Sequence, residues 1–342
     1  MAKESTMPQT RASGQEQPAA RPARFGSAAR LLLGMVIIAG LVAAVFRIGD
    51  LQRFVELARR ARPIWLLGAA VLQVSTYLAL ALGWRAVLCR AGASMPLTKL
   101  MPLALAKLFA DQAIPSAGVG GNILLVDRLT ALGVPRGAAM ATLLISMVGF
   151  YASYAVLSIV MLVVLWLHGR ATPLMLGLVT SFLLVALAIP SLALWLRARG
   201  SRPLPQRIER LGPIRDLMHA IGDAPRDLVR DRGLVARVAM LNGMIFLADS
   251  LTLACCLVAI GQPAVVGAAF VALIAASIVA TLGPIPLGLG SFEATATGTL
   301  HVLGIPIEAA ITATLMLRGF TLWLPLIPGG LLLRQAVRHK AR

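Results

Sequence analysis

The chain has 342 residues, of which 58% are hydrophobic and only 13% are charged. A soluble domain of this size needs about a quarter of its residues charged to cover its surface, so the composition excludes that class and predicts an all-α polytopic membrane protein. The net charge of +18 does not indicate nucleic-acid binding, because the basic residues lie in short loops and tails between apolar spans and aromatic residues make up only 5%.

The first segments in chain order are a polar tail and a short membrane-anchored unit. Residues 1–28 are rich in Pro, Ala and Arg and predict a disordered cytoplasmic tail rather than a cleaved signal peptide. Residues 29–62 predict a first transmembrane helix, over 29–46, and a helix that lies on the membrane surface. In that second segment the apolar residues recur at helical spacing and the charges take the opposite face.

The rest of the chain predicts two similar units joined by a linker. Further full spans are expected at 63–88, 137–167, 173–196, 234–260 and 305–333, which makes about six in all. Two more apolar regions, 97–132 and 264–303, are interrupted by Pro and Gly and predict broken helix pairs, either re-entrant or fully spanning. The expected units are repeat 1 (63–167), a linking helix with a basic cytoplasmic loop (168–233), repeat 2 (234–334) and a basic cytoplasmic tail (335–342).

A sequence motif recurs at one fixed offset. The stretches PSAGVGGNILLVDRLTALGVP and PLGLGSFEATATGTLHVLGIP both open on proline and glycines and close on Leu-Gly-(Val/Ile)-Pro. Their first prolines are separated by 286 − 115 = 171 residues, and their last by 306 − 135 = 171. An odd number of crossings separates corresponding spans, so the sequence predicts an inverted repeat, an architecture typical of transporters.

The distribution of Lys and Arg predicts the orientation. The tails and the loop at 197–237 carry most of the basic residues, which favours cytoplasmic N- and C-termini. A high share of Ala and Arg with few Lys is typical of a bacterium of high genomic GC. The expected location is therefore the bacterial cytoplasmic (inner) membrane.

Charged and polar residues inside apolar segments are the candidate binding residues, because a charge in hydrocarbon costs about 3 kcal/mol or more unless it is paired or faces water. Glu293 and Arg318 have opposite charge and are the most deeply embedded, so we expect them to pair. Lys107 and Asp111 lie four residues apart and can pair on one helical face. The candidate set for a lipid head group is Glu293, Arg318, Asp111, Lys107, Asn122, Asp127, Arg128 and Asp249.

Several of these candidates have a simpler interpretation. Lys107 and Arg128 can be interfacial cations that extend to the head-group region, and Asp249 can be a structural hydrogen-bonding group. The prolines and glycines of the two breaks can present backbone N–H groups to a phosphate, or can allow close helix packing. Those turn residues are Pro115, Gly118, Gly120, Gly121, Pro286, Gly288 and Gly290. No catalytic residue, metal site or cofactor is expected, because the histidines and cysteines have no ligand spacing.

At GPIPLGLGSFEA, and at LGIPIEAA and LMLRGFTLWLPL after it, the chain resembles the lysylphosphatidylglycerol synthase transmembrane-region family of flippase-like proteins. The likeness extends over about residues 30–335. Pro286, Gly288, Gly290, Glu293 and Arg318 fit the family pattern, as does Phe292, whereas Leu287 stands where a glycine is common. The first motif departs more, since Asn122 and Leu125 stand where the family often has an acid and an arginine.

The resemblance implies lipid handling, either translocation of a lipid head group between leaflets or support of envelope lipid or glycolipid synthesis. With the embedded basic residues, we expect a protein without enzymatic activity that binds and translocates an anionic phospholipid or lipid-linked head group. The C-terminal aminoacyl-transferase domain of some members does not follow, so no synthesis of aminoacylated lipid is expected. One alternative is a non-catalytic partner of the enzymes of lipid, hopanoid or glycolipid synthesis. An intramembrane lipid transferase is less favoured, because no tight acidic cluster is present. The expected partners are the lipid, the membrane and possible lipid-synthesis enzymes, and not nucleic acid.

Overall fold

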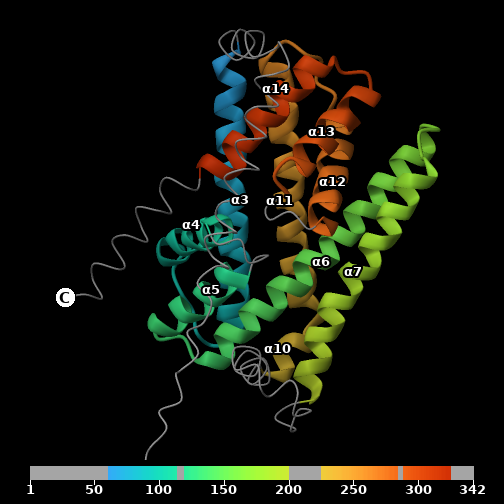
Figure 1. The fold of residues 1–342 in the computed structure, drawn as a ribbon. Coiled ribbons are helices and arrows are strands. Elements are labelled where there is room, and N and C mark those ends of the chain that lie inside the picture. The colour runs from blue at the N-terminus through green and yellow to red at the C-terminus, as the bar shows by residue number, and fades with distance from the viewer. Residues whose placement is uncertain (1–60, 114–118, 200–224, 284–287, 325–342) are drawn as a thin grey trace, which may run out of the picture. The chain divides into compact units, whose positions relative to one another are not determined.

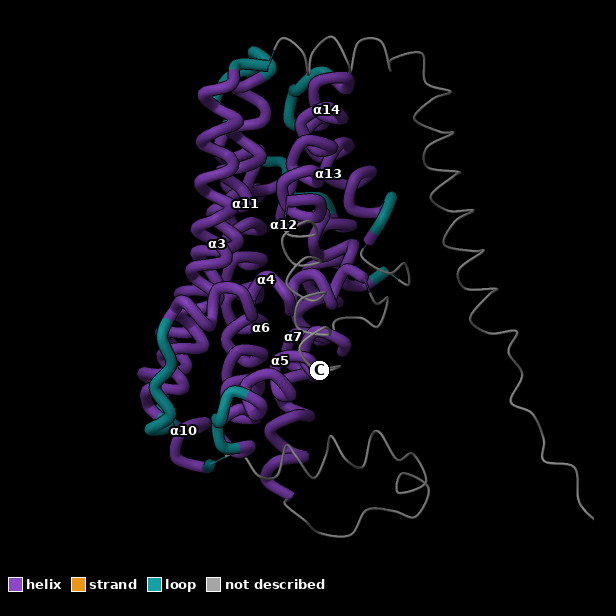
Figure 2. The backbone as a smooth tube through the Cα atoms, turned by 90° about the vertical axis from the view of Figure 1, so that its left-hand side faces the viewer, coloured by secondary structure: helices purple, strands orange, loops and turns teal. Residues whose placement is uncertain are grey.

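The described part of the chain consists of helices. The computed structural model describes residues 61–113, 119–199, 225–283 and 288–324, and within them Figure 2 shows helices and loops and no strand. The helices are α3 (Pro63–Arg90), α4 (Leu97–Ala113), α5 (Val119–Ala131), α6 (Arg136–Leu167), α7 (Pro173–Arg199), α10 (Arg226–Arg230), α11 (Arg232–Ala259), α12 (Val266–Leu282), α13 (Ser291–Val302), α14 (Ile307–Arg318) and the π-helical turn η2 (Gly319–Trp323). The predicted first span and nearly all of the surface helix lie outside the described residues.

Four described helices are long and apolar enough to cross a membrane, namely α3, α6, α7 and α11. They match the second to fifth predicted spans, so these four predictions are confirmed. Large apolar side chains project outward from them, and Trp166 and Leu187, for example, are 70% and 64% exposed. Helices that are apolar on their outer faces are stable only in an apolar medium, which makes the protein a multi-pass membrane protein.

The two interrupted regions each contain two short helices. In the first, α4 has 17 residues and α5 has 13; in the second, α12 has 17 and α13 has 12. None reaches the roughly 20 residues that cross a hydrocarbon core. In each pair the two helices contact one another, α4 with α5 and α12 with α13, as Figure 1 shows. The predicted break in each region is thus present.

The recurring Leu-Gly-(Val/Ile)-Pro motif makes the same turn in both places. Gly133 and Gly304 have φ of +89° and +99°, a conformation open to glycine, and end α5 and α13. The next amide returns to the carbonyl five residues back, from Val134 to Leu129 and from Ile305 to Leu300, each at 3.0 Å. The proline that follows starts the next helix. The motif is therefore a helix stop and restart, used twice.

Helices α3 and α11 run antiparallel and form the most extensive helix pair in the described structure. At one end the Arg62 amide donates to the Ala259 carbonyl at 2.8 Å, and at the other the Arg90 Nε donates to Asp231 Oδ2 at 3.1 Å. The start of each helix therefore lies beside the end of the other. With the 171-residue offset, α3 corresponds to residues 234–261, nearly the bounds of α11.

Two of the apolar cores are built from corresponding residues. One joins α3, α4, α5 and the start of α6, and the other joins α11, α12, α13 and α14. Residues separated by 171 positions occupy both cores, namely Leu125 and Ala296, Leu129 and Leu300, Val134 and Ile305, Ala138 and Ala309, and Ala139 and Ala310. Helices α6 and α7 form a hairpin (Figure 1), packed through Tyr154 and Phe182 with ring centroids 4.1 Å apart, and a further apolar core joins this hairpin to α11 and α12.

The last predicted span begins as expected but changes its winding. Helix α14 starts at Ile307 and ends at Arg318, and the next five residues form the π-helical turn η2. Residues beyond 324 lie outside the described structure. A π-turn inserts an extra residue per turn and occurs frequently at functional sites. Hydropathy does not reveal it, because apolar residues continue through the turn.

Asp231 predicts an acid-sensitive contact at the start of α11. The Leu234 amide, which Asp231 caps at 3.0 Å, and then the Arg90 guanidinium hold the pKa of this carboxyl below its ordinary value of about 3.9. A lowered pKa stabilises the fold above that ordinary value, and this contribution is lost as the pH falls through the folded-state pKa. We expect Asp231→Ala to lower the melting temperature in detergent at pH 7 and to have less effect near pH 3. An equal effect at both pH values would contradict the assignment.

Candidate functional site

The predicted pair of Glu293 and Arg318 is present. Arg318 Nε lies 2.6 Å from Glu293 Oε1, and the two side chains are only 12% and 15% exposed. Glu293 is in the first turn of α13, and Arg318 is the last residue of α14, so the contact joins two helices. The opposite charges offset the cost of burying each of them alone.

The backbone around this pair supplies further polar groups. The second oxygen of Glu293 accepts from the Gly290 amide at 2.7 Å, which satisfies a free N–H at the start of α13. Arg318 Nη2 donates to the Gly288 carbonyl at 3.4 Å, and its guanidinium carbon lies 4.2 Å from the centre of the Phe292 ring. Glycine turn, helix start and ion pair thus form one polar group, which we call the α13–α14 site (Gly288, Gly290, Phe292, Glu293 and Arg318).

The predicted pair in the first interrupted region is also present. Lys107 Nζ lies 2.7 Å from Asp111 Oδ2 on α4, and each side chain is 20% exposed. Gly121 on α5 faces this pair, because a Cβ there would overlap Asp111 Oδ1 and lie 2.8 Å from the Lys107 carbonyl oxygen. Asp111 Oδ1 is buried and has no hydrogen-bond partner within the described residues. We call these three residues the α4–α5 site.

Asp249 lies in a third polar group, between α3 and α11. The Gln73 amide donates to Asp249 Oδ1 at 2.7 Å and to the Thr252 hydroxyl at 3.3 Å. Gln73 is 2% exposed and was not among the residues predicted from the sequence. Its position as an uncharged amide in the middle of an apolar span is the sequence signal that could have identified it. This group bridges the two antiparallel helices and fits the structural interpretation of Asp249.

The remaining candidates have less definite surroundings. Asn122 follows Gly121 in α5 and is half-buried, whereas Asp127 is exposed and Arg128 half-buried in the last turns of the same helix. Gly120 is in the first turn of α5. Pro115, Gly118 and Pro286 lie outside the described residues. The predicted residues are therefore distributed over contacts between different helix pairs and do not form one common cluster.

The α13–α14 site has the chemistry of an anion site with its own counter-ion. An arginine guanidinium and a helix N-terminus are groups that commonly bind anions, and here the Glu293 carboxylate contacts both. Within the described ranges, no group of three or more His, Cys, Asp or Glu side chains is placed to hold a metal ion.

No curated protein gives a significant match to the chain. A family described as the lysylphosphatidylglycerol synthase TM region matches residues 31–329, which includes every helix of the described structure. The chain therefore belongs to the lysylphosphatidylglycerol synthase transmembrane-region family, whose members are membrane proteins of lipid metabolism.

Proposed function

We propose that this protein binds an anionic phospholipid or lipid-linked head group and moves it between the two leaflets, without making or breaking covalent bonds. The observation that carries the proposal is the ion pair of Arg318 with Glu293 at the start of α13, 2.6 Å long and almost buried. An arginine at this depth in an apolar protein is expensive to keep, and such residues commonly mark a substrate pathway.

The proposed binding step exchanges one anion for another. A head-group phosphate approaches the Arg318 guanidinium and replaces the Glu293 carboxylate, which keeps its second contact with the Gly290 amide. The phosphate is then held by the guanidinium fork and the positive end of α13.

We further propose that the two units form an inverted repeat with re-entrant short helices. The 171-residue offset relates α3, α4, α5 and α6 to α11, α12, α13 and α14, and the α3–α11 pair is antiparallel. Inverted repeats with broken helices support alternating access, in which one unit rocks against the other around a fixed site. The Lys107–Asp111 pair supplies a second charged position on the opposite unit.

Reconstituted liposomes test the proposed function. Purified protein is incorporated into vesicles that contain a fluorescent phosphatidylglycerol, and a membrane-impermeant quencher reports the lipid that reaches the outer leaflet. Wild type is expected to expose the label at least tenfold faster than protein-free vesicles, and Arg318→Gln to abolish this gain. Arg237→Gln, which changes an exposed arginine of α11, is the matched control.

The outcomes separate the proposal from its alternative. The proposal of translocation would be contradicted if vesicles with folded wild-type protein exposed the label no faster than protein-free vesicles. This result would have to hold for every lipid class tested. Co-purification of a lipid-synthesis enzyme with such an inactive protein would favour the role of a non-catalytic partner. Transport at the wild-type rate by Arg318→Gln would support lipid translocation but would contradict the assignment of the head-group site to Arg318.

A further inference from the structure

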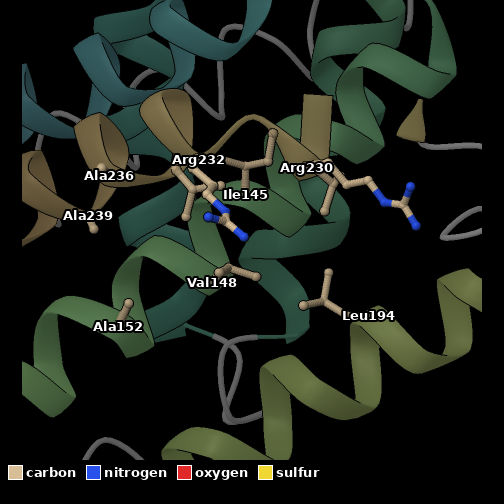
Figure 3. A pocket seen from close by; sticks show the side chains of 10 residues that line it. Ile145, Val148, Ala152, Leu194, Arg230, Arg232, Ala236 and Ala239 are labelled. Carbon is tan, nitrogen blue, oxygen red and sulfur yellow. The ribbon is translucent and has the colours of Figure 1, made fainter. Parts of the chain in front are cut away.

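A cavity of about 330 Å³ lies away from the α13–α14 site, where α10 ends at Arg230 and α11 begins at Arg232. It falls within the roughly 300–1,000 Å³ range of small-molecule sites. Four helices line it, as Figure 3 shows: Ile145, Val148 and Ala152 come from α6, Leu194 from α7, Val229 and Arg230 from α10, and Arg232, Val235, Ala236 and Ala239 from α11. None of these residues belongs to the sites described above.

The lining has two chemically different parts. Eight of the ten residues carry aliphatic side chains, which leaves the body of the cavity without a polar side chain. The other two are arginines at the polar end of the helices, and both are exposed. In Figure 3 the Arg232 side chain extends over Val148. The Arg230 side chain points away from Val148, on the side where Leu194 lies. An apolar body with a cationic rim complements an amphiphile that has one anionic end.

The acidic side chains near the cavity do not neutralise these two arginines. Asp231, which lies between them in sequence, accepts from the Leu234 amide and pairs with Arg90 at 3.1 Å. Neither Arg230 nor Arg232 has an ion-pair partner among the described residues. Asp227 on α10 is exposed and does not line the cavity. Counting only the described residues, the rim therefore carries two positive charges without an acidic partner, at the level where the apolar helices end.

We propose that this cavity holds one anionic phospholipid as a resident lipid, with an acyl chain against α6, α7 and α11 and the phosphate at Arg232 and Arg230. Apolar lipid tails satisfy the aliphatic walls, and basic residues near a membrane surface attract anionic head groups. The lipid bridges α6, the last helix of the first unit, and α11, the first helix of the second, with α7 and α10 of the linking segment beside it. It therefore links the two units, separately from the lipid that the protein is proposed to move.

Photo-crosslinking locates the lipid directly. Full-length protein in detergent is mixed with phosphatidylglycerol that carries a diazirine near the middle of one acyl chain, irradiated, digested and analysed by mass spectrometry. Labelling is expected on peptides that contain Val148, Ala152, Leu194 or Val235. Labelling spread evenly over the outward faces of α3 and α7 would overturn the proposal, because it would indicate ordinary bulk lipid.

Native mass spectrometry measures the affinity and its dependence on charge. Delipidated protein is titrated with phosphatidylglycerol and, separately, with phosphatidylcholine. Each of Arg230→Gln and Arg232→Gln is expected to weaken the first phosphatidylglycerol site about fivefold, and the double variant about 25-fold. Arg237→Gln, an exposed arginine of the same helix outside the cavity, is expected to change the affinity less than twofold.

A cavity-filling variant distinguishes a lipid in the cavity from one adsorbed at the surface. Ala152 and Ala236 are exposed to the cavity, so Ala152→Leu/Ala236→Leu adds volume there without overpacking a core. It is expected to lower phosphatidylglycerol binding at least tenfold while the melting temperature without lipid stays near that of wild type. Unchanged binding in this variant, equal affinity for both lipids, or no bound lipid in wild type would each overturn the proposal.

Discussion

Replacing Arg318 by alanine is expected to lower the free energy of unfolding by about 3–5 kcal/mol. The change removes one partner of an almost buried ion pair and leaves the Glu293 carboxylate with the Gly290 amide as its remaining contact in the α13–α14 site. It also removes the guanidinium that lies against the Phe292 ring. Reversible unfolding in mixed detergent, followed by circular dichroism, measures this loss.

A double-mutant cycle separates the pair from general damage. Glu293→Ala should also destabilise strongly, because it removes both the partner of Arg318 and the helix contact at Gly290. The double variant is expected to be more stable than the sum of the two single losses, by at least about 1 kcal/mol. Additive losses would show that the pair has no coupling. Arg237→Ala, an exposed arginine, should change stability by less than about 0.5 kcal/mol.

Exchanging the two charges is expected to restore stability only in part. A glutamate at position 318 and an arginine at position 293 recover the attraction between opposite charges. They do not recover the carboxylate contact with the Gly290 amide, nor the guanidinium above Phe292. A partial recovery of the free energy of unfolding is therefore the result that this geometry predicts for the double exchange Glu293→Arg/Arg318→Glu.

Gly288→Ala is expected to lower stability by roughly 2–5 kcal/mol and to disturb the α13–α14 site. Gly288 has φ of +61°, which costs an alanine about 1–2 kcal/mol. An added Cβ would also overlap the Ala280 side chain and lie 3.1 Å from the Ala280 Cα on α12. Because the Gly288 carbonyl accepts from Arg318, a backbone shift here moves an acceptor of that arginine.

Gly298→Ala provides the matched control. Gly298 is exposed in the middle of α13, and a Cβ there meets no atom within 4 Å. Alanine is a better helix former than glycine by about 1 kcal/mol, so this variant should be unchanged or slightly more stable. Thermal unfolding of both variants in one detergent checks the prediction. Similar destabilisation by both changes would show that Gly288 has no special role.

The two units carry their charges at different places. Under the 171-residue offset, Glu293 and Arg318 correspond to Asn122 and Met147, both half-buried and uncharged. Conversely, Lys107 and Asp111 correspond to Ile278 and Leu282. Among the described residues, the two units therefore share the arrangement of their helices but carry their close ion pairs at non-equivalent positions. In the proposed function the units then have unequal roles, with the phosphate-binding arginine in the second.

The sequence by itself determined the membrane class, four of the spans, both helix breaks and the two close ion pairs. These features follow from local patterns: apolar length, Pro and Gly at fixed positions, and charges that must find a partner in hydrocarbon. The 171-residue offset between the two Leu-Gly-(Val/Ile)-Pro motifs is likewise read from the chain alone, and the structure shows that both motifs make the same turn.

Only the tertiary structure decided which helices meet and what surrounds each charge. The contact of Gln73 with Asp249 joins residues 176 positions apart, and Gly121 faces Lys107 and Asp111 because α5 folds back on α4. The cavity lined by α6, α7, α10 and α11 likewise has no continuous sequence signal, since four separate segments supply its walls. In an apolar chain almost every helix face is hydrophobic, so periodicity does not select a packing partner, and long-range contacts have to be seen in three dimensions.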